Sequence, residues 1–198
     1  MGIDVARLKD RIRDVADFPR PGVVFKDITP LLGDAAAFGD CVAALADRFA
    51  DSAVDKVMGI EARGFIIAAP VAQRLGAGFV PVRKAGKLPW RVEKQEYVLE
   101  YGTDVLEVHC DGVEVGERVL IVDDVLATGG TAEATARLAG RLGAVTVGFG
   151  CIIELAFLGG RQRLAAGGAF PVGKLDGIDA VSLVSYGAPA KQEVGVRR

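Results

Sequence analysis

The feature of this sequence most able to do chemistry is a pair of adjacent carboxylates followed by a glycine-rich turn. Asp123 and Asp124 end an apolar run, and the turn that follows consists of Ala127, Thr128, Gly129, Gly130 and Thr131. Free backbone N–H groups at a helix start bind anions, and glycine lets the backbone approach a ligand closely, so this turn predicts a phosphate site. The carboxylates cannot bind that phosphate and suit sugar hydroxyls, or Mg²⁺ held through oxygen or water. The alternative is an ordinary strand-to-helix turn in which Asp124 only caps the helix.

Charged residues also follow two other predicted strands. The first group lies between an apolar run and a helical pattern and consists of Glu61, Ala62, Arg63 and Gly64. The second is a dense cationic group that consists of Arg83, Lys84 and Lys87. Backbone N–H groups at the helix start and the guanidinium of Arg63 can bind an anion. Two alternatives stand beside this interpretation: a surface ion pair between Glu61 and Arg63, and a solvated charge run at 83–87.

The composition describes a globular chain without a nucleic-acid or membrane partner. Its 198 residues suit one domain, 51% of them are hydrophobic, and the formal net charge of −2 gives no basic surface for nucleic acid. No run approaches the roughly 18 apolar residues that a membrane span requires. Cys41, Cys110 and Cys151 are too far apart for a zinc site, and His109 is the only histidine. We therefore expect reduced thiols in the cytoplasm and no histidine-based metal site or catalysis.

The elements that must position these residues alternate along the chain. Predicted strands, each a nearly continuous apolar run, cover residues 54–60, 78–84, 118–124, 144–153 and 179–186. Predicted helices cover residues 64–76 and 131–143, and each ends at a glycine. This alternation predicts an α/β fold, a parallel sheet with helices on both faces. Ligands bind beyond the carboxyl ends of the strands in such a sheet, which is where Asp123 and Asp124 lie.

Two segments stand outside this alternation. Near the N-terminus a helical spacing is formed by Val5, Leu8, Ile12 and Val15. A segment rich in proline and glycine follows, and Asp34 is the expected N-cap of a second helix. Residues 85–117 form a long excursion whose later part is β-prone. Excursions of that length are functional lids or disordered, so we expect a β-ribbon that closes over a site.

The paired acids and the Gly-Gly turn together resemble the phosphoribosyl-diphosphate signature of the type I phosphoribosyltransferase family. Four further stretches resemble, in family order, its adenine phosphoribosyltransferases: 18–32 (FPRPGVVFKDITPLL), 59–72 (GIEARGFIIAAPVA), 80–89 (VPVRKAGKLP) and 97–109 (YVLEYGTDVLEVH). The resemblance spans nearly the whole chain. It implies a purine salvage enzyme that transfers phosphoribose from 5-phosphoribosyl 1-diphosphate to adenine, giving AMP and diphosphate. It further implies Mg²⁺ bound with the sugar diphosphate, and a homodimer.

The resemblance also implies roles for the cosubstrate-binding residues. The turn 127–131 holds the 5-phosphate, while Asp123 and Asp124 contact the ribose hydroxyls. No direct protein ligand is assigned to Mg²⁺, and contact of Asp123 and Asp124 with the ion through water stays open. The implied diphosphate contacts are Glu61, Ala62, Arg63, Gly64, Arg83 and Lys87, and a non-proline cis peptide is frequent in the first of these turns.

For the base, the resemblance assigns the backbone groups of Val24, Phe25 and Lys26 to the adenine edge, with Phe25 stacking on the ring. Backbone amides and carbonyls suffice for this because adenine offers both a donor and acceptors. Glu100 is implied to reach the N7 side of adenine and assist proton movement, and Tyr101 to order the loop near the leaving group.

The resemblance divides the chain into a hood and a core. Residues 1–33 form most of the hood, residues 34–198 the core, and a loop of about residues 85–102 closes to exclude water, all within one structural domain. One alternative is an enzyme of the same fold that acts on guanine, xanthine or orotate. A second, argued against by chain length and charge, is a regulator that senses phosphoribosyl diphosphate and binds nucleic acid.

Overall fold

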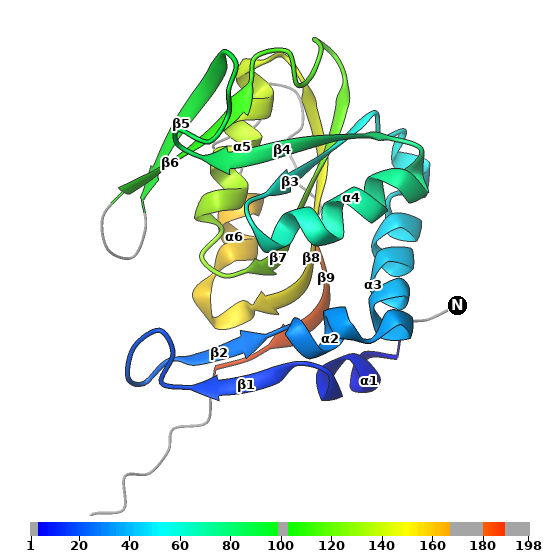
Figure 1. Cartoon of the computed structure of the whole chain (residues 1–198), viewed down its shortest axis with the longest axis vertical. Helices are drawn as coiled ribbons and strands as arrows, with labels where there is room; N and C mark the ends of the chain where they lie inside the picture. The colour runs from blue at the N-terminus through cyan, green and yellow to red at the C-terminus, as the bar shows by residue number, and fades with distance from the viewer. Residues whose placement is uncertain (1–3, 99–102, 167–179, 189–198) are drawn as a thin grey trace, which may run out of the picture.

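A seven-stranded sheet organises the computed structural model, which describes residues 4–98, 103–166 and 180–188 (Figure 1). The strand order is β5-β6-β4-β3-β7-β8-β9. Its parallel part consists of β3 (Lys56–Ile60), β4 (Gly78–Lys84), β7 (Arg118–Leu126), β8 (Val145–Leu155) and β9 (Ala180–Tyr186). The predicted parallel α/β sheet is therefore confirmed, with strands that begin or end within two residues of the expected ranges.

Helices cover both faces of this sheet. One face carries α3 (Ala35–Arg48) and α4 (Arg63–Leu75), and the other carries α5 (Gly130–Arg141) and α6 (Gly160–Ala165). The carboxylate of Asp34 accepts hydrogen bonds from the N–H groups of Ala36 and Ala37 at 3.1 Å, so it is the predicted N-cap of α3. Gly76 ends α4 in the left-handed conformation, with φ of 68°, as its position in the sequence indicates.

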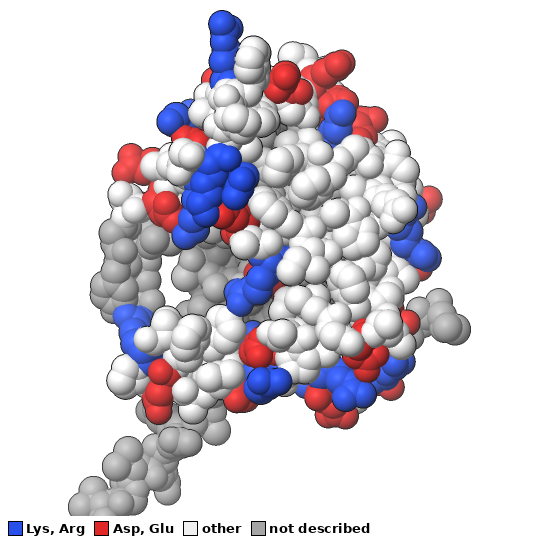
Figure 2. All heavy atoms as spheres, in the orientation of Figure 1, with Lys and Arg blue, Asp and Glu red and all other residues white. Residues whose placement is uncertain are grey.

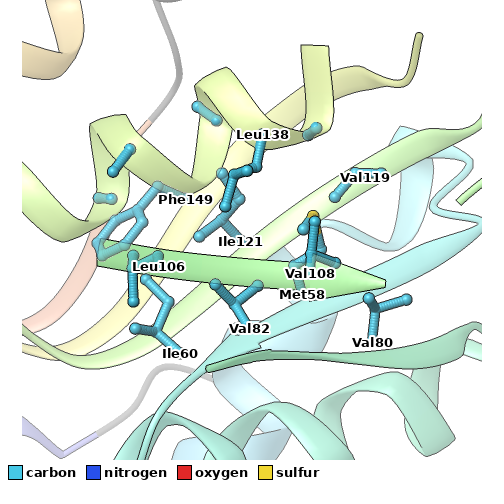
Figure 3. Close-up of a cluster of buried hydrophobic side chains, with 14 of the residues drawn as sticks. Met58, Ile60, Val80, Val82, Leu106, Val108, Val119, Ile121, Leu138 and Phe149 are labelled. Carbon is cyan, nitrogen blue, oxygen red and sulfur yellow. The ribbon is translucent and has the colours of Figure 1, made fainter. Parts of the chain in front are cut away.

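Two hydrophobic clusters fill the layers on either side of the sheet. On β3, Met58 and Ile60 belong to the cluster under α5, whereas Val57 belongs to the cluster under α3 and α4. Figure 3 shows the first cluster, in which Ile121 of β7 and Leu138 of α5 lie near the β3 side chains. This alternation with a period of two is what a strand buried on both faces requires.

The excursion between β4 and β7 forms the expected β-ribbon. Strand β5 (Val92–Val98) pairs antiparallel with β6 (Thr103–His109), and β6 in turn pairs with the end of β4 through Arg83 and Lys84. The ribbon thus extends the main sheet at its edge.

The N-terminal segment departs from one prediction. It contains α1 (Val5–Asp10), β1 (Arg13–Ala16), β2 (Val24–Asp27) and α2 (Thr29–Gly33). The helix expected to reach Val15 instead ends at Asp10, and Val15 lies on β1, paired with Phe25 of β2. Cross-strand pairing thus overrides a helical spacing that includes the β-branched Ile12 and Val15, which favour strands. Figure 1 places the β1–β2 hairpin beyond the carboxyl ends of β7 and β8.

Two short 3₁₀ turns, Ala50–Ser52 and Ala156–Leu158, complete the elements of the described ranges. Among the helices in these ranges, none is both long and apolar enough to cross a membrane.

Candidate functional site

The predicted site residues of the core gather where the parallel strands end. Glu61 follows β3, Arg83 lies at the end of β4, and Asp123 lies near the end of β7. These strands are neighbours in the order β4-β3-β7 and run parallel, so their carboxyl ends meet at one edge. Figure 2 shows a hollow at this edge of the sheet, between the β5–β6 ribbon and the β1–β2 hairpin, with charged side chains around it.

The turn 127–131 lines a cavity of about 230 Å³ at this edge. The lining residues are Tyr97, Asp123, Val125, Leu126, Ala127, Thr128, Gly129, Gly130 and Thr131. Gly129 adopts a φ of 79° and is the N-cap of α5, where no side chain caps the helix. Asp124 is therefore not the helix cap of the alternative interpretation. The geometry leaves the first N–H groups of α5 without a capping side chain, as an anion site at a helix start requires.

The two carboxylates are nearly buried, and Asp123 lines this cavity. Asp123 is 8% exposed and Asp124 7%. Arg63 Nε lies 2.6 Å from Asp124 Oδ2, and the N–H of Asp124 donates to Asp123 Oδ1 at 2.9 Å. Burial, followed by the adjacent Asp124 charge, raises the pKa of Asp123 well above its usual value. Asp123 thus retains a proton at a higher pH than an exposed aspartate, while Asp124 is paired with a cation.

Helix α4 approaches the acid pair closely because its second residue is glycine. A Cβ added to Gly64 would lie 2.9 Å from Asp123 Oδ1 and 3.1 Å from the carbonyl oxygen of Val122. The lack of a side chain therefore brings the N-terminus of α4, and Arg63 with it, against the end of β7. The Glu61–Ala62 peptide just before α4 is cis, as the family resemblance suggested.

Glu61 contacts the cationic residues at the end of β4 and just after it. Its Oε2 accepts hydrogen bonds from the N–H of Lys84 at 2.9 Å and from Arg83 Nε at 3.3 Å, while its Oε1 contacts Lys87 Nζ. Arg83 Nη1 also donates to the carbonyl oxygen of Lys87 at 3.2 Å. Burial acts to raise the pKa of Glu61, but the hydrogen bonds from Lys87 and its neighbours outweigh burial and hold the pKa below its usual value.

This arrangement differs from both alternatives stated for these residues. Arg63 pairs with Asp124 and not with Glu61, so the surface pair between Glu61 and Arg63 is absent. Arg83 and Lys87 are not independently solvated, because the same carboxylate contacts both.

The hairpin residues predicted to contact the base have different surroundings. The ring of Phe25 lies 5.0 Å from the Arg63 guanidinium carbon and packs edge-on against Phe18, with centroids 5.2 Å apart. Val24 is 44% exposed. The side chain of Lys26 contacts other residues, since its Nζ lies 2.6 Å from Asp14 Oδ1 and 4.1 Å from the centroid of the Tyr186 ring. Lys26 therefore has only its backbone to offer a base, whereas Phe25 faces Arg63.

The expected catalytic pair, Glu100 and Tyr101, lies outside the described residues, between the end of β5 and the start of β6. The structure adds Tyr97, which the sequence analysis did not single out. Tyr97 lines the cavity, is 8% exposed and donates to Asp104 Oδ2 at 3.3 Å. Burial, together with the Asp104 charge, raises the pKa of Tyr97 to about 12, so its hydroxyl remains a donor near neutral pH. The sequence shows only an aromatic residue in a β-prone run there; its position depends on the packing of β5 against α5.

Similarity to known proteins agrees with this geometry. Residues 32–163 match the family model described as phosphoribosyl transferase domain. The chain is 59% identical over 155 residues to an adenine phosphoribosyltransferase of Acidothermus cellulolyticus, an alignment that covers 78% of this chain and 88% of the relative.

Two solved structures extend this similarity to the fold. The adenine phosphoribosyltransferase of Thermoanaerobacter pseudethanolicus superposes with a TM-score of 0.84 at 47% identity, over 92% of this chain and 100% of the other. The enzyme of Saccharomyces cerevisiae, solved with adenine and an imino-altritol bisphosphate, superposes with a TM-score of 0.81 at 34% identity, over 91% and 98% of the two chains.

Proposed function

The chain belongs to the adenine phosphoribosyltransferase family, and from this premise we propose how its residues transfer phosphoribose from 5-phosphoribosyl 1-diphosphate to adenine. The products are AMP and diphosphate, a reaction of purine salvage. One observation carries the assignment of residues: Arg63 contacts the acid pair through Asp124 and the base strand through Phe25. A single side chain thus links the sugar side of the site to its base side.

The 5-phosphate binds in the turn 127–131. The support for this is the uncapped start of α5, the left-handed Gly129 and the cavity that the turn lines. Backbone N–H groups and the helix dipole favour the phosphate there. Asp123 and Asp124 accept hydrogen bonds from the ribose hydroxyls, and Arg63 pairs with Asp124 beside them.

The diphosphate binds between the turn after β3 and the cations at and just after the end of β4. Arg63, Arg83 and Lys87 supply positive charge, and Ala62 and Gly64 supply backbone N–H groups. Glu61 carries the wrong charge to bind diphosphate, and its three hydrogen bonds support a role in orienting Arg83 and Lys87.

Adenine lies against β2, where backbone groups of residues 24–26 read its edge and the Phe25 ring stacks on it. As N9 attacks the ribose carbon C1, the bond from C1 to the diphosphate oxygen breaks and positive charge builds on the sugar. Asp124 and the oxygens of the substrate stabilise that charge. Glu100 assists the movement of the proton that adenine loses, and Tyr101 orders the surrounding loop.

Mg²⁺ is proposed to enter with the sugar diphosphate. Within the ranges that the structure describes, no three His, Cys, Asp or Glu side chains converge as a metal site. The oxygen atoms of Asp123 and Asp124 suit Mg²⁺, and because each carboxylate already engages a neighbour, they fit contact through water better than direct ligation. When bound there, the ion would supply positive charge against the diphosphate leaving group.

We also propose a division of the chain into a hood, a core and a loop that closes over the site. The two-stranded sheet of β1 and β2, separate from the main sheet, supports a hood of residues 1–33 over a core of residues 34–198. The ribbon that flanks residues 99–102 supports closure of the loop at about 85–102 over the site.

Two further proposals concern assembly and location. The exposed Ile66 and Phe79, from the adjacent α4 and β4, support a surface that a second copy covers in a homodimer. Light scattering that gives the mass of one chain would contradict the homodimer. The free thiols of Cys41, Cys110 and Cys151 support the cytoplasm, where thiols stay reduced.

A base-competition assay tests the proposed function. Purified protein is incubated with 5-phosphoribosyl 1-diphosphate and an equimolar mixture of adenine, guanine, xanthine and orotate, with and without Mg²⁺. We expect AMP as the dominant nucleotide, and only with Mg²⁺. A dominant nucleotide formed from another base would assign that base as the substrate. Retained binding of the sugar diphosphate without any nucleotide product would favour a regulator that senses phosphoribosyl diphosphate.

A further inference from the structure

The short helix α6 lies directly against the turn 127–131. A Cβ added to Gly160, the first residue of α6, would lie 2.3 Å from the carbonyl oxygen of Ala127, and one added to Gly129 would lie 3.0 Å from the carbonyl oxygen of Gly160. The backbones of α6 and the turn therefore touch with no side chain between them. Because close-packed backbone cannot yield, a shift of the first turn of α6 must shift the turn 127–131 as well.

A charged network attaches the first turn of α6 to the main sheet. Arg161 donates from Nε to Glu154 Oε1 at 2.9 Å and from Nη2 to Glu154 Oε2 at 2.5 Å. The hydroxyl of Ser182 donates to Glu154 Oε2 at 2.6 Å, and Arg161 Nη1 donates to the carbonyl oxygen of Ala180. Glu154 lies on β8, Ser182 and Ala180 lie on β9, and Arg161 directly follows Gly160. The network thus joins the two strands to the part of α6 that touches the turn.

Glu154 is the centre of this network. It is only 5% exposed, and both of its carboxylate oxygens accept hydrogen bonds. The Arg161 guanidinium holds the pKa of Glu154 below its usual value, so the pair is ionised at neutral pH. A buried ion pair adds little net stability because desolvation offsets the attraction, but its two-point hydrogen bonding fixes geometry.

We propose that Glu154 is a positioning residue: through Arg161 and Ser182 it holds α6 against the turn 127–131 and so keeps that turn in the shape that binds the 5-phosphate. Glu154 itself contacts no substrate. The inference rests on the proposed function of the turn. Since the 5-phosphate does not change during the reaction, loss of its binding affects the ground state and the transition state equally. The signature is therefore a raised KM with an unchanged kcat.

The decisive variant is Glu154→Gln, which keeps the size of the side chain and removes its charge. We expect KM for 5-phosphoribosyl 1-diphosphate to rise about tenfold, the effect of losing one charged hydrogen bond, with kcat and KM for adenine within about twofold. The Kd of ribose 5-phosphate, measured by calorimetry, should rise by a similar factor. The Kd of free diphosphate should not change, because it has no 5-phosphate group.

Two further variants separate positioning from general destabilisation. Ile152→Val removes one methylene from the same strand, in the hydrophobic cluster of the opposite layer, and should leave every binding constant unchanged. Ser182→Ala removes the hydrogen bond that Ser182 donates to Glu154 and the one that it accepts from Arg161 Nη2, and it keeps the ion pair. We therefore expect a rise of about threefold in the Kd of ribose 5-phosphate. This second variant decides the question if Glu154→Gln does not fold.

The outcomes distinguish this inference from the proposed function. If the wild-type protein binds no ribose 5-phosphate and forms no AMP, the proposed function of the turn is wrong. If the wild type binds it and Glu154→Gln, or Ser182→Ala in its place, binds it equally well, the positioning role is overturned while the function stands. An Ile152→Val effect as large as that of Glu154→Gln would also overturn it.

Discussion

Replacing Glu61 by Gln changes one charge at the point where three donors meet. The carboxylate accepts the N–H of Lys84 at 2.9 Å and Arg83 Nε at 3.3 Å, and it contacts Lys87 Nζ. A Gln side chain keeps an oxygen for the Lys84 N–H. The same oxygen can still accept from Arg83 Nε, but the NH₂ group replaces the oxygen that contacts Lys87 Nζ and cannot accept a hydrogen bond. Because the side chain is neutral, both ion pairs are lost in the Glu61→Gln variant.

The magnitude follows from the exposure of the two cations. The side chain of Arg83 is 33% exposed and that of Lys87 is 47% exposed, whereas Glu61 is 9% exposed. Solvent screening limits each pair to about 0.5–1 kcal/mol, so the free energy of unfolding should fall by about 1–2 kcal/mol. For a chain of this length, that corresponds to a loss of roughly 2–8 °C in Tm.

The pH dependence has a definite sign. Because the pKa of Glu61 is lowered in the folded protein, its contribution to stability is present above the unfolded value, 4.5, and is lost as the pH falls through the folded value. Thermal melts from neutral pH to below that value should show the Tm difference between wild type and Glu61→Gln shrinking as acid is added. Asp40→Asn, which removes an exposed pair with Arg7, is the matched control and should change Tm by less than Glu61→Gln.

The same variant should weaken binding of the cosubstrate. If Glu61 orients Arg83 and Lys87, KM for 5-phosphoribosyl 1-diphosphate should rise about 3- to 10-fold in Glu61→Gln, since a tenfold change corresponds to ~1.4 kcal/mol. A KM that stays the same would refute the orienting role, and a KM that falls would in addition indicate that Glu61 competes with the diphosphate for Arg83 and Lys87. A Tm difference that is constant with pH would refute the electrostatic explanation of stability.

Three other substitutions test the remaining groups of the site. Glu100→Ala should lower kcat by about 10²- to 10⁴-fold while binding of the sugar diphosphate stays intact, and a kcat near that of the wild type would remove Glu100 from the chemistry. Asp124→Asn should raise KM for 5-phosphoribosyl 1-diphosphate in steady-state assays, because the ribose hydroxyls lose a charged acceptor; an unchanged KM and rate would contradict this. Phe25→Ala should raise KM for adenine roughly 5- to 100-fold through the loss of stacking, with little change for the cosubstrate, and equal effects on both substrates would argue against a base contact.

Local signals explain which parts of the fold could be predicted. Asp34 at the start of α3 and Gly76 at the end of α4 act on their own neighbours in the chain, so their effects can be read from a few residues. The strands of the parallel sheet were equally predictable from the sequence, because a strand buried on both faces must be apolar throughout. The prediction of a helix that includes Val15 was wrong for the opposite reason. Val15 pairs with Phe25, ten residues away, and the spacing of nearby apolar residues does not indicate this pairing.

The sequence by itself determined the layers of the protein and the kinds of group at its site. It placed the acid pair and the turn 127–131, a predicted phosphate site, at the end of a strand, and the cations at or after the ends of the neighbouring strands, since these positions follow from local pattern. Only the tertiary structure decided which charged side chains form ion pairs. Arg63 pairs with Asp124, and Glu61 pairs with Arg83 and Lys87.

The physical reason is that such contacts join elements far apart in the chain. The cavity position of Tyr97 depends on the packing of β5 against α5, and the pairing of Glu154 with Arg161 and Ser182 depends on the order of β8 and β9 in the sheet. Residue types set what each group can do chemically. Its partner is set by the three-dimensional packing of strands and helices, which no short stretch of the sequence encodes.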